Sequence, residues 1–279
     1  MKLSVVVPCY NEAVNVSEFE SELSKALLKE KITYEIIFID DGSTDDTYSK
    51  LSSLNKANKN VKVIRFSRNF GKESAMLAGL KNASGSYVAI MDADLQHTPE
   101  MLVLMYKKLI NDDSFDCCCA YKSNREDEGS LKRTLTSLFY KINNKISDVK
   151  LLPGASDFRV FKKTVCDAIT SLDEKTRFLK GMFSWVGFNT IYVPYMPEKR
   201  MYGTSKWSLF KLLKYSLGGI ISFSTKPIKS VFIIGVLALI VGLLNFILMG
   251  NLANRTIILF ISFIMLQLGI ISLYVSRIY

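Results

Sequence analysis

Two uncharged stretches near the carboxyl terminus constrain the fold of this chain most. Residues 231–249 and 257–275 contain no Asp, Glu, Lys or Arg. A helix of this length spans about 28 Å, which matches the hydrocarbon core of a bilayer. Because the segment 251–255 between them is short, we predict a helical hairpin that crosses the membrane twice and returns to the same side. This prediction divides the chain into a domain over residues 1–225 and a transmembrane hairpin over residues 226–279.

The basic residues around the hairpin indicate its orientation. Lys226 and Lys229 precede the first apolar stretch and Arg277 follows the second, whereas Arg255 lies in the connection. Basic residues are more frequent on the cytoplasmic side of membrane proteins. Residues 1–9 show neither the basic leader nor the cleavage site of a signal peptide. We therefore predict a multi-pass protein of the cytoplasmic (inner) membrane whose large domain faces the cytoplasm.

The chain is basic, with a formal net charge of +10. No known nucleic-acid-binding motif accompanies this charge, so we predict no nucleic-acid partner. Membrane lipids are the simpler partner, because basic residues near the negative cytoplasmic leaflet gain about 1 kcal/mol each. The five cysteines form no CxxC pair and lie in apolar runs. This pattern indicates buried, reduced thiols rather than a metal site or disulfides.

The first 120 residues alternate apolar, β-branched runs with segments of helical period. This alternation is typical of a Rossmann-like α/β fold, in which helices cover a mostly parallel sheet. The predicted strands are residues 3–7, 35–39, 61–66, 87–91 and 116–120. The predicted helices cover residues 16–27, 45–58, 72–83 and 99–111. After residue 120 the regular alternation ends.

Two later segments are both amphipathic and basic. Residues 131–146 place six apolar side chains on one helical face, and residues 206–217 carry Trp207 as an aromatic anchor on theirs. Such helices are suited to lying in the membrane interface, but they can equally pack on a core. For residues 131–146 both interpretations stay open. For residues 206–217 we favour the interface, because the segment leads within a few residues into the first apolar stretch.

Polar residues directly follow three of the predicted strands. They lie in residues 8–12, 40–43 and 92–96. In open α/β sheets, ligands bind at the carboxyl ends of strands, so we expect these three segments to converge on one cleft. No GxGxxG follows a strand and no GxxxxGK[ST] occurs, which argues against a dinucleotide dehydrogenase and against a P-loop enzyme.

The segment MDADLQH at residues 91–97 carries the strongest chemical signal. Asp92 and Asp94 are two residues apart after an apolar strand, so in extended backbone their carboxylates point the same way. Two such oxygen ligands and a nucleotide diphosphate would together form a site for Mg²⁺ or Mn²⁺. The alternative is a polar turn with helix-capping aspartates. The spacing alone decides neither this nor which aspartate holds the ion.

Further motifs occur in a fixed order around this segment. They are VVVPCYNE at residues 5–12, DDGSTDDT at 40–47, SRNFGKESAMLAGL at 67–80, GASDFRVF at 154–161, RFLKG at 177–181 and RMYGTSK at 200–206. With this combination the chain resembles the inverting glycosyltransferases of family two, which have a GT-A fold. Within the family it looks most like polyprenyl-phosphate hexosyltransferases, the group of bactoprenol glucosyltransferases and dolichyl-phosphate mannose synthases. The resemblance covers nearly the whole chain, including the terminal double span.

The resemblance implies roles for residues on the donor side. Pro8, Tyr10 and Glu12 would line the nucleotide. Asp41 would accept a hydrogen bond from the uracil N3–H, since a carboxylate suits a base edge that presents a donor between two carbonyls.

The same resemblance assigns the metal and the catalytic carboxylate. Asp92, with Ala93 beside it, would contact the nucleotide-sugar, and Asp94 and Gln96 would hold the ion next to Asp92. Asp94 is thereby counted with Asp157 among the catalytic groups. Asp157 matches the position regarded in this family as the catalytic carboxylate. Its alternative role is a salt bridge to Arg159.

Basic residues near position 200 would bind phosphate. Arg200 and Lys206 match the pair that grips either the diphosphate or the lipid phosphate, and Ser205 would join them at the lipid phosphate. The alternative is that Lys206 only contacts the membrane surface.

Taken together, these assignments predict a membrane enzyme that moves a hexose from a UDP-sugar to undecaprenyl (polyprenyl) phosphate with inversion, for modification of a cell-envelope glycan. Glucose is the first candidate, while galactose, N-acetylhexosamine and mannose stay open. The alternative from another class is a non-catalytic membrane scaffold that kept a nucleotide-sugar fold. A homo-oligomer stays open as well.

Overall fold

The computed structural model describes residues 2–122, 130–147, 149–172, 178–195, 223–224, 226–248 and 252–278. The chain forms two compact units. The first contains Met1–Tyr140 and Leu151–Leu212, and the second contains Lys141–Lys150 and Leu213–Tyr279. The predicted boundary near residue 225 stays a prediction.

A seven-stranded sheet organises the first unit. The strands are β1 (Lys2–Cys9), β2 (Thr33–Asp40), β3 (Val61–Arg65), β4 (Tyr87–Ile90), β5 (Cys117–Lys122), β6 (Ala155–Lys162) and β7 (Thr190–Tyr195). Their order in the sheet is β3-β2-β1-β4-β6-β5-β7. The first four are mutually parallel, β5 is parallel to β7, and β6 runs antiparallel to both of its neighbours. The predicted α/β class with a mostly parallel sheet is therefore confirmed.

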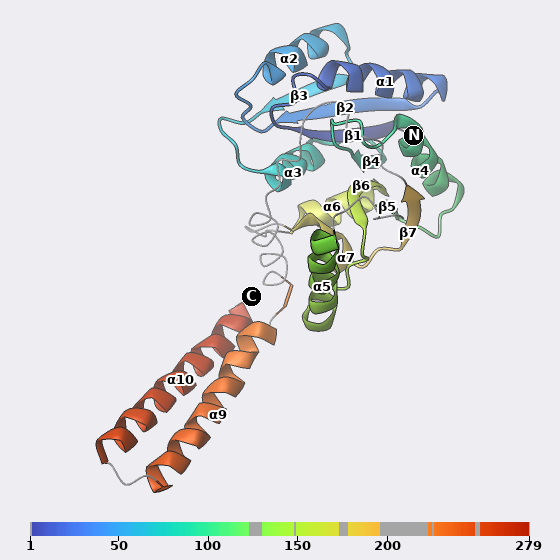
Figure 1. Ribbon diagram of the computed structural model, residues 1–279. Helices are drawn as coiled ribbons and strands as arrows, with labels where there is room; N and C mark the ends of the chain where they lie inside the picture. Colours follow the sequence, from blue (N-terminus) through green and yellow to red (C-terminus); the bar gives the residue numbers. More distant parts are fainter. Residues whose placement is uncertain are drawn as a thin grey trace. The chain divides into compact units, whose positions relative to one another are not determined.

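Helices cover both faces of this sheet (Figure 1). Those of the first unit are α1 (Val16–Lys29), α2 (Thr47–Ala57), α3 (Lys72–Asn82), α4 (Pro99–Asn111), α6 (Lys163–Thr170) and α7 (Leu179–Trp185), and α5 covers Ser130–Ile146. Successive side chains of each strand point to opposite faces of the sheet. Val5 and Val7 join the core cluster beneath α1 and α4, whereas Val6 lies against Gly79 of α3. A Cβ at Gly79 would come within 2.2 Å of the Val6 side chain, so α3 packs very closely on the sheet.

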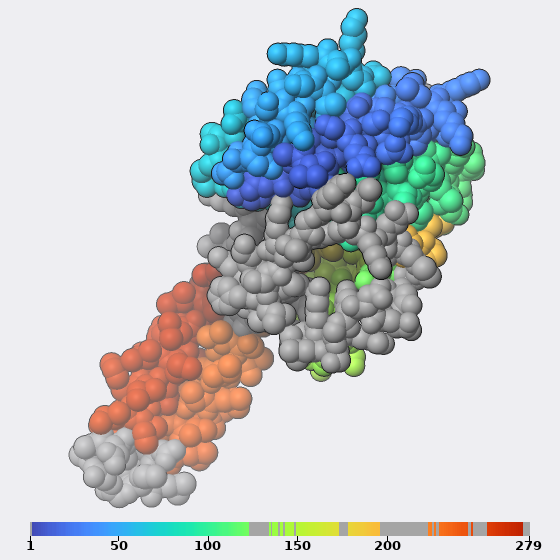
Figure 2. All heavy atoms as spheres, turned by 45° about the horizontal axis from the view of Figure 1, so that its top comes forward, coloured from blue at the N-terminus to red at the C-terminus, as the bar shows by residue number. Residues whose placement is uncertain are grey.

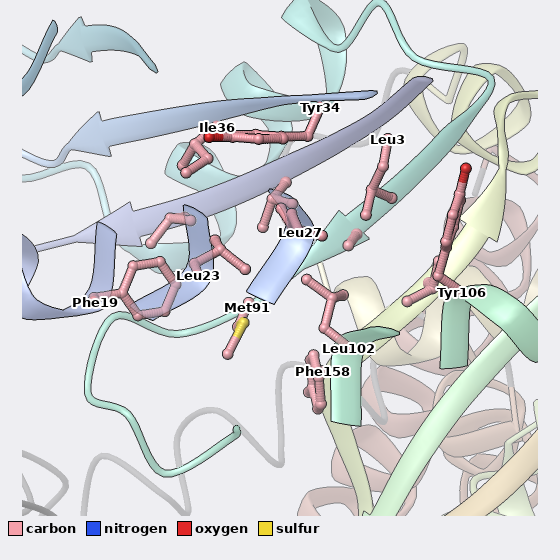
Figure 3. Packing of buried hydrophobic residues seen from close by; sticks show 14 of the residues in the cluster. Leu3, Phe19, Leu23, Leu27, Tyr34, Ile36, Met91, Leu102, Tyr106 and Phe158 are labelled. Carbon is pink, nitrogen blue, oxygen red and sulfur yellow. The ribbon is translucent and has the colours of Figure 1, made fainter. Parts of the chain in front are cut away.

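The core beneath α1 and α4 follows the predicted helical face. Phe19, Leu23 and Leu27 of α1 are fully buried, and Figure 3 shows them in one cluster with residues of the strands and of α4. Burial of each such side chain contributes roughly 1.5–3 kcal/mol. In the space-filling view, the atoms of α1, α2 and the first strands form one continuous blue surface over this core (Figure 2). All five cysteines are free and buried, as predicted.

The sequence-based prediction of elements is accurate for the first half of the sheet and incomplete for the second. Strands β1 to β5 and helices α1 to α4 lie within a few residues of their predicted ranges, and a helix forms over residues 130–146. No strand was predicted at β6 or β7. β6 inserts between β4 and β5, which are consecutive in the list of predicted strands. This insertion depends on contacts between residues far apart in sequence, which local periodicity does not encode.

The second unit contains a pair of long helices, α9 (Lys226–Leu248) and α10 (Leu252–Ile278). They pack against each other through glycines. A Cβ at Gly235 would lie 2.6 Å from the carbonyl oxygen of Met265, and one at Gly269 would lie 2.6 Å from Cα of Phe232. Ser224 donates to the carbonyl oxygen of Ile146, so the start of α9 is tied to the end of α5.

α9 begins before its predicted span, and α10 extends beyond its predicted span at both ends. α10 begins at Leu252, so residues 252–255 are helical rather than a connection, because polar residues can continue a helix beyond its apolar part. In the part of the chain that the structure describes, one segment, Thr256–Val275, is long and apolar enough to cross a membrane. The apolar segment of α9, Lys229–Leu244, is shorter than the predicted 231–249.

Candidate active site

The three polar segments that follow β1, β2 and β4 lie side by side at one edge of the sheet. These strands are neighbours in the order β2-β1-β4 and all run parallel, so their carboxyl ends meet. Carboxylates gather there. Burial first, and then the negative charges of Glu12, Asp40 and Asp92, raise the pKa of the Cys9 thiol. The predicted convergence of the three segments at one edge of the sheet is thus present in the fold, and the cleft itself stays a prediction.

Side chain to backbone hydrogen bonds join the segment after β1 to the segment after β2. The backbone N–H of Asn11 donates to Ser43 Oγ at 3.0 Å, and that of Glu12 donates to Thr47 Oγ1 at 2.8 Å. In return, Asn11 Oδ1 accepts from the backbone N–H of Thr44 at 2.9 Å. These bonds fix the backbone between Pro8 and Glu12, where the nucleotide is predicted to bind.

Asp41 is anchored by backbone groups. It is only 3% exposed, and its two oxygens accept from the backbone N–H groups of Phe70 and Gly71 at 2.7 and 2.9 Å. Burial outweighs these hydrogen bonds and raises its pKa above the ordinary value. Gly42 allows this contact, because a Cβ there would lie 2.4 Å from the backbone of Arg68 and its φ is +67°. A carboxylate oxygen has a second lone pair, so the predicted bond to a nucleobase remains compatible with this geometry.

The segment Asp92 to Gln96 differs in backbone from its prediction. β4 ends at Ile90 and residues 93–94 form a turn, so the two aspartates do not lie in extended backbone. Burial nevertheless alternates: Asp92, Asp94 and Gln96 are partly exposed, whereas the residues between them, Ala93 and Leu95, are buried. Three oxygen-bearing side chains of this turn are therefore partly accessible.

The side-chain oxygens of this turn are possible ligands of a divalent metal ion. Mg²⁺ and Mn²⁺ prefer carboxylate and amide oxygens and keep several sites for water and phosphate, which Asp92, Asp94 and Gln96 suit by ligand type. Within the described residues, no group of three His, Cys, Asp or Glu side chains is arranged to hold a metal. The ion would thus depend on the Gln96 amide or on phosphate oxygens, and its ligands stay a prediction.

Asp157 lies on β6 and shares the ammonium of Lys72 with Asp92, so it lies at the same edge of the sheet. Its partners among the described residues are lysines, with Lys72 Nζ 3.0 Å from Oδ2 and Lys180 Nζ 3.8 Å from Oδ1. The alternative that Asp157 serves a salt bridge to Arg159 is therefore wrong: Arg159 donates to the carbonyl oxygen of Ser156 and lies over the ring of Phe183. Burial raises the pKa of Asp157, but Lys180, Lys72 and Arg159 outweigh it and hold the pKa well below its usual range.

Lys72 is a site residue that sequence analysis missed. Its ammonium lies 2.7 Å from Asp92 Oδ1 as well as 3.0 Å from Asp157 Oδ2. Burial alone would lower the pKa of Lys72, but the two carboxylates raise it, so the side chain is a permanent cation. The residue lies in the motif SRNFGKESAMLAGL, but its two partners are 20 and 85 positions away.

His97, to which the sequence assigns no ligand role, has a structural environment. Its Nε2 lies 3.0 Å from Tyr195 Oη and 3.2 Å from Ser156 Oγ, and its ring lies against Phe158. Burial lowers the pKa of His97 to about 4, so the ring is neutral near pH 7. His97 thus joins the turn after β4 to the strand that carries Asp157 and to β7.

The predicted phosphate-binding residues Arg200, Ser205 and Lys206 lie outside the described residues. The same holds for the predicted interfacial helix 206–217. Their roles stay predictions. A separate groove of about 570 Å³ lies between α1 and α4, and none of the predicted site residues lines it.

A parallel sheet with carboxylates at adjacent strand ends, and with a further carboxylate on an inserted antiparallel strand, places the chain in the GT-A class of α/β folds. The comparison with protein families is more specific. The model of Glycosyl transferase family 2 matches residues 4–170, more than half of the chain. The chain belongs to glycosyl transferase family 2, and the protein is a glycosyltransferase.

Individual relatives extend the similarity to the whole chain. It is 37% identical to a putative glycosyltransferase, CsbB, of Bacillus subtilis, covering 99% of this chain and 87% of that protein. It is 35% identical to a prophage bactoprenol glucosyl transferase homolog of Escherichia coli, covering 100% and 95%. Among solved structures it is similar to glucosyl-3-phosphoglycerate synthase of Mycobacterium tuberculosis in complex with Mn²⁺, UDP-glucose and phosphoglyceric acid. That match has a TM-score of 0.51 and 18% identity and covers 77% of this chain and 76% of the other.

Proposed function

We propose that this protein transfers a hexose, with glucose as the first candidate, from a UDP-sugar to polyprenyl phosphate at the cytoplasmic face of the membrane. One observation carries the proposal: the similarity to a bactoprenol glucosyl transferase homolog spans the entire chain, including the apolar carboxyl-terminal helices. A soluble acceptor would not require such an anchor, whereas a polyprenyl chain cannot leave the hydrocarbon.

The proposed reaction divides the cleft into a donor side and an acceptor side. On the donor side, Pro8, Tyr10 and Glu12 line the nucleotide and Asp41 reads the uracil. A divalent ion held by Asp92, Asp94 and Gln96 would neutralise charge on the departing diphosphate. Mn²⁺ or Mg²⁺ fits this ligand set, and the relative with UDP-glucose was solved with Mn²⁺.

On the acceptor side, the lipid phosphate itself is the nucleophile. The second pKa of a phosphate monoester is near 6, so at pH 7 it is mostly dianionic and needs no base. Asp157, kept ionised by Lys72 and Lys180, would orient the sugar hydroxyls or the acceptor rather than remove a proton. In-line attack of a phosphate oxygen on the anomeric carbon inverts its configuration. Arg200, Ser205 and Lys206 would bind the phosphate of the lipid.

The direct test is UDP release by the full chain in lipid nanodiscs that contain undecaprenyl phosphate. We expect release with one UDP-sugar and no release without the acceptor. UDP-glucose, UDP-galactose, UDP-N-acetylglucosamine and UDP-N-acetylgalactosamine, and GDP-mannose with GDP release as its readout, would identify the sugar, and NMR of the product would show a β linkage. If a folded chain released no nucleotide from any donor, the proposal would be refuted and the non-catalytic scaffold would become the favoured hypothesis.

The proposal also includes a membrane hairpin in which both α9 and α10 cross the bilayer. The buried native cysteines make labelling practical, because they are shielded from reagents. We expect a cysteine placed at Asn251 to react with a membrane-impermeant maleimide in intact cells, whereas one at Ser230 should react only after the cells are opened. Protection of both positions in intact cells would contradict a hairpin that crosses twice.

A further inference from the structure

Lys72 occupies a central position that the proposed roles leave unexplained. It is the first residue of α3, and its ammonium contacts both oxygens of Asp92, at 2.7 and 2.8 Å, and Oδ2 of Asp157, at 3.0 Å. The three residues come from three different elements: a helix, the turn after β4, and β6. One side chain thus cross-links the donor side and the acceptor side of the cleft.

The Lys72 ammonium donates a hydrogen bond to each of the two carboxylates and forms an ion pair with both. An ammonium has three N–H donors, and three carboxylate oxygens lie within 3.0 Å of Nζ. Within the described part of the chain, Lys180 is the other cation paired with Asp157, but it is 3.8 Å away and donates to the carbonyl oxygen of Ala155 at 3.1 Å. Among these two lysines, only Lys72 also contacts Asp92.

The backbone that carries Lys72 is held on both sides. Immediately before it, the N–H groups of Phe70 and Gly71 donate to Asp41. Immediately after it, the Glu73 carboxylate accepts from the backbone N–H of Leu179, at the start of α7. Because its neighbours are fixed to β2 and to α7, Lys72 is presented to the cleft with little freedom, as a preorganised group requires.

We propose that Lys72 is a positioning residue of the transfer reaction: its ammonium holds Asp92 and Asp157 at a fixed separation, so that the donor sugar and the acceptor oxygen meet in line. The inference rests on the proposed function, which places Asp92 at the nucleotide-sugar and Asp157 at the reacting groups. A displacement of about 1 Å between reacting groups can lower a rate about 100-fold, so a cross-link of this kind has a large effect on turnover.

The test compares Lys72→Met, Lys72→Arg and Lys81→Met in the full chain. Methionine keeps the approximate length of the side chain and removes the charge, and Lys81 is an exposed lysine on the same helix that serves as the matched control. We expect Lys72→Met to lower kcat about 100-fold with the KM for the UDP-sugar changed less than threefold. Lys72→Arg should recover at least tenfold of that loss, and Lys81→Met should match the native protein. A kcat for Lys72→Met within threefold of the native value, or a rise in KM with kcat unchanged, would overturn the proposal.

A second measurement separates failure of this inference from failure of the proposed function. If the native chain releases no UDP with any donor, the proposed function fails, and the cross-link is then tested by thermal melts of Lys72→Met, Asp157→Asn and the double variant. We expect each single variant to lower Tm by roughly 2–4 °C and the double variant to be no less stable than Lys72→Met, because the interaction is lost only once. If the decreases in Tm of the two single variants added up in the double variant, the two residues would be independent and the proposed cross-link would be refuted.

Discussion

Two carboxylates at the edge of the sheet, Asp41 and Asp157, are held in contrasting ways. Asp41 lies at the end of β2 and is fixed by two backbone N–H groups of one loop. Asp157 lies on β6 and is fixed by the side chains of Lys72 and Lys180, which come from two different helices. Both arrangements join segments far apart in sequence, but the partners of Asp41 are neutral backbone groups, whereas those of Asp157 are charged side chains.

The electrostatic consequences are opposite. Burial raises the pKa of Asp41, and neutral N–H donors only partly compensate. For Asp157 the same effect of burial is outweighed by cations, which lower its pKa. A carboxylate held by backbone can recognise a ligand through hydrogen bonds, while one surrounded by cations stays ionised through a reaction in which charge moves. The difference fits donor recognition for Asp41 and action on the reacting groups for Asp157.

The largest expected effect is on the donor side as a whole. Chelation with EDTA should abolish transfer, because the diphosphate would depart without a counter-charge, and added Mn²⁺ or Mg²⁺ should restore it. Asp94→Ala should have the same effect without a change in Tm beyond roughly 2 °C. UDP release assays with and without chelator provide the measurement. Full activity in EDTA would show that no divalent ion is needed and would refute the assignment of Asp92, Asp94 and Gln96 as metal ligands.

Asp157→Asn should have the next largest effect. It keeps the shape of the side chain and removes the charge between the lysines, so we expect kcat to fall about 100- to 1,000-fold while the affinity for UDP changes less than threefold. Steady-state kinetics and UDP titration by calorimetry measure the two quantities. Unchanged turnover would leave Asp157 with a structural role only.

Asp41→Asn should change KM more than kcat, the opposite of Asp157→Asn. Loss of a charge-assisted hydrogen bond costs about 1.5–3 kcal/mol, so the KM for the UDP-sugar should rise roughly 10- to 100-fold with kcat at saturation changed much less. Asn also presents an NH₂ group to a site with two N–H donors, so part of the loss should appear as a lower Tm. If Asp41→Asn lowered kcat as strongly as Asp157→Asn does, the division between the two carboxylates would be wrong.

The smallest expected effect is on the pH dependence of stability. Because the folded pKa of Asp157 is lowered from 3.8, its contribution is present above that pH and is lost as the pH falls below it. The Tm of Asp157→Asn should therefore lie a few degrees below the native value at pH 7, and the gap should narrow below about pH 4. Asp41 has a raised pKa, so its ionisation opposes folding. The Tm of Asp41→Asn relative to that of the native protein should therefore increase as the pH rises above 3.8. Melts of both variants between pH 2 and 7 measure this, and gaps independent of pH would contradict the assignment.

Much of the donor side could be predicted from sequence, because it depends on local rules. Apolar runs that end in Pro8 to Glu12, in Asp40 to Ser43 and after Ile90 predict strands whose ends carry ligands, and in a parallel sheet those ends must meet. The sequence also determined the apolar segment of α10, the buried thiols and, through its motifs, membership in the glycosyl transferase family that the comparison confirms.

What only the tertiary structure decided concerns the acceptor side. The antiparallel insertion of β6 between β4 and β5 brings Asp157 close to Asp92, and the packing of α3 places Lys72 between them. Neither follows from periodicity, since the pairing of strands is set by the burial of both faces of the whole sheet. From the sequence alone, Lys72 is indistinguishable from any lysine in the first turn of a helix. Its contacts with Asp92 and Asp157 form only because packing brings three elements, separated by up to 85 positions, within hydrogen-bond distance.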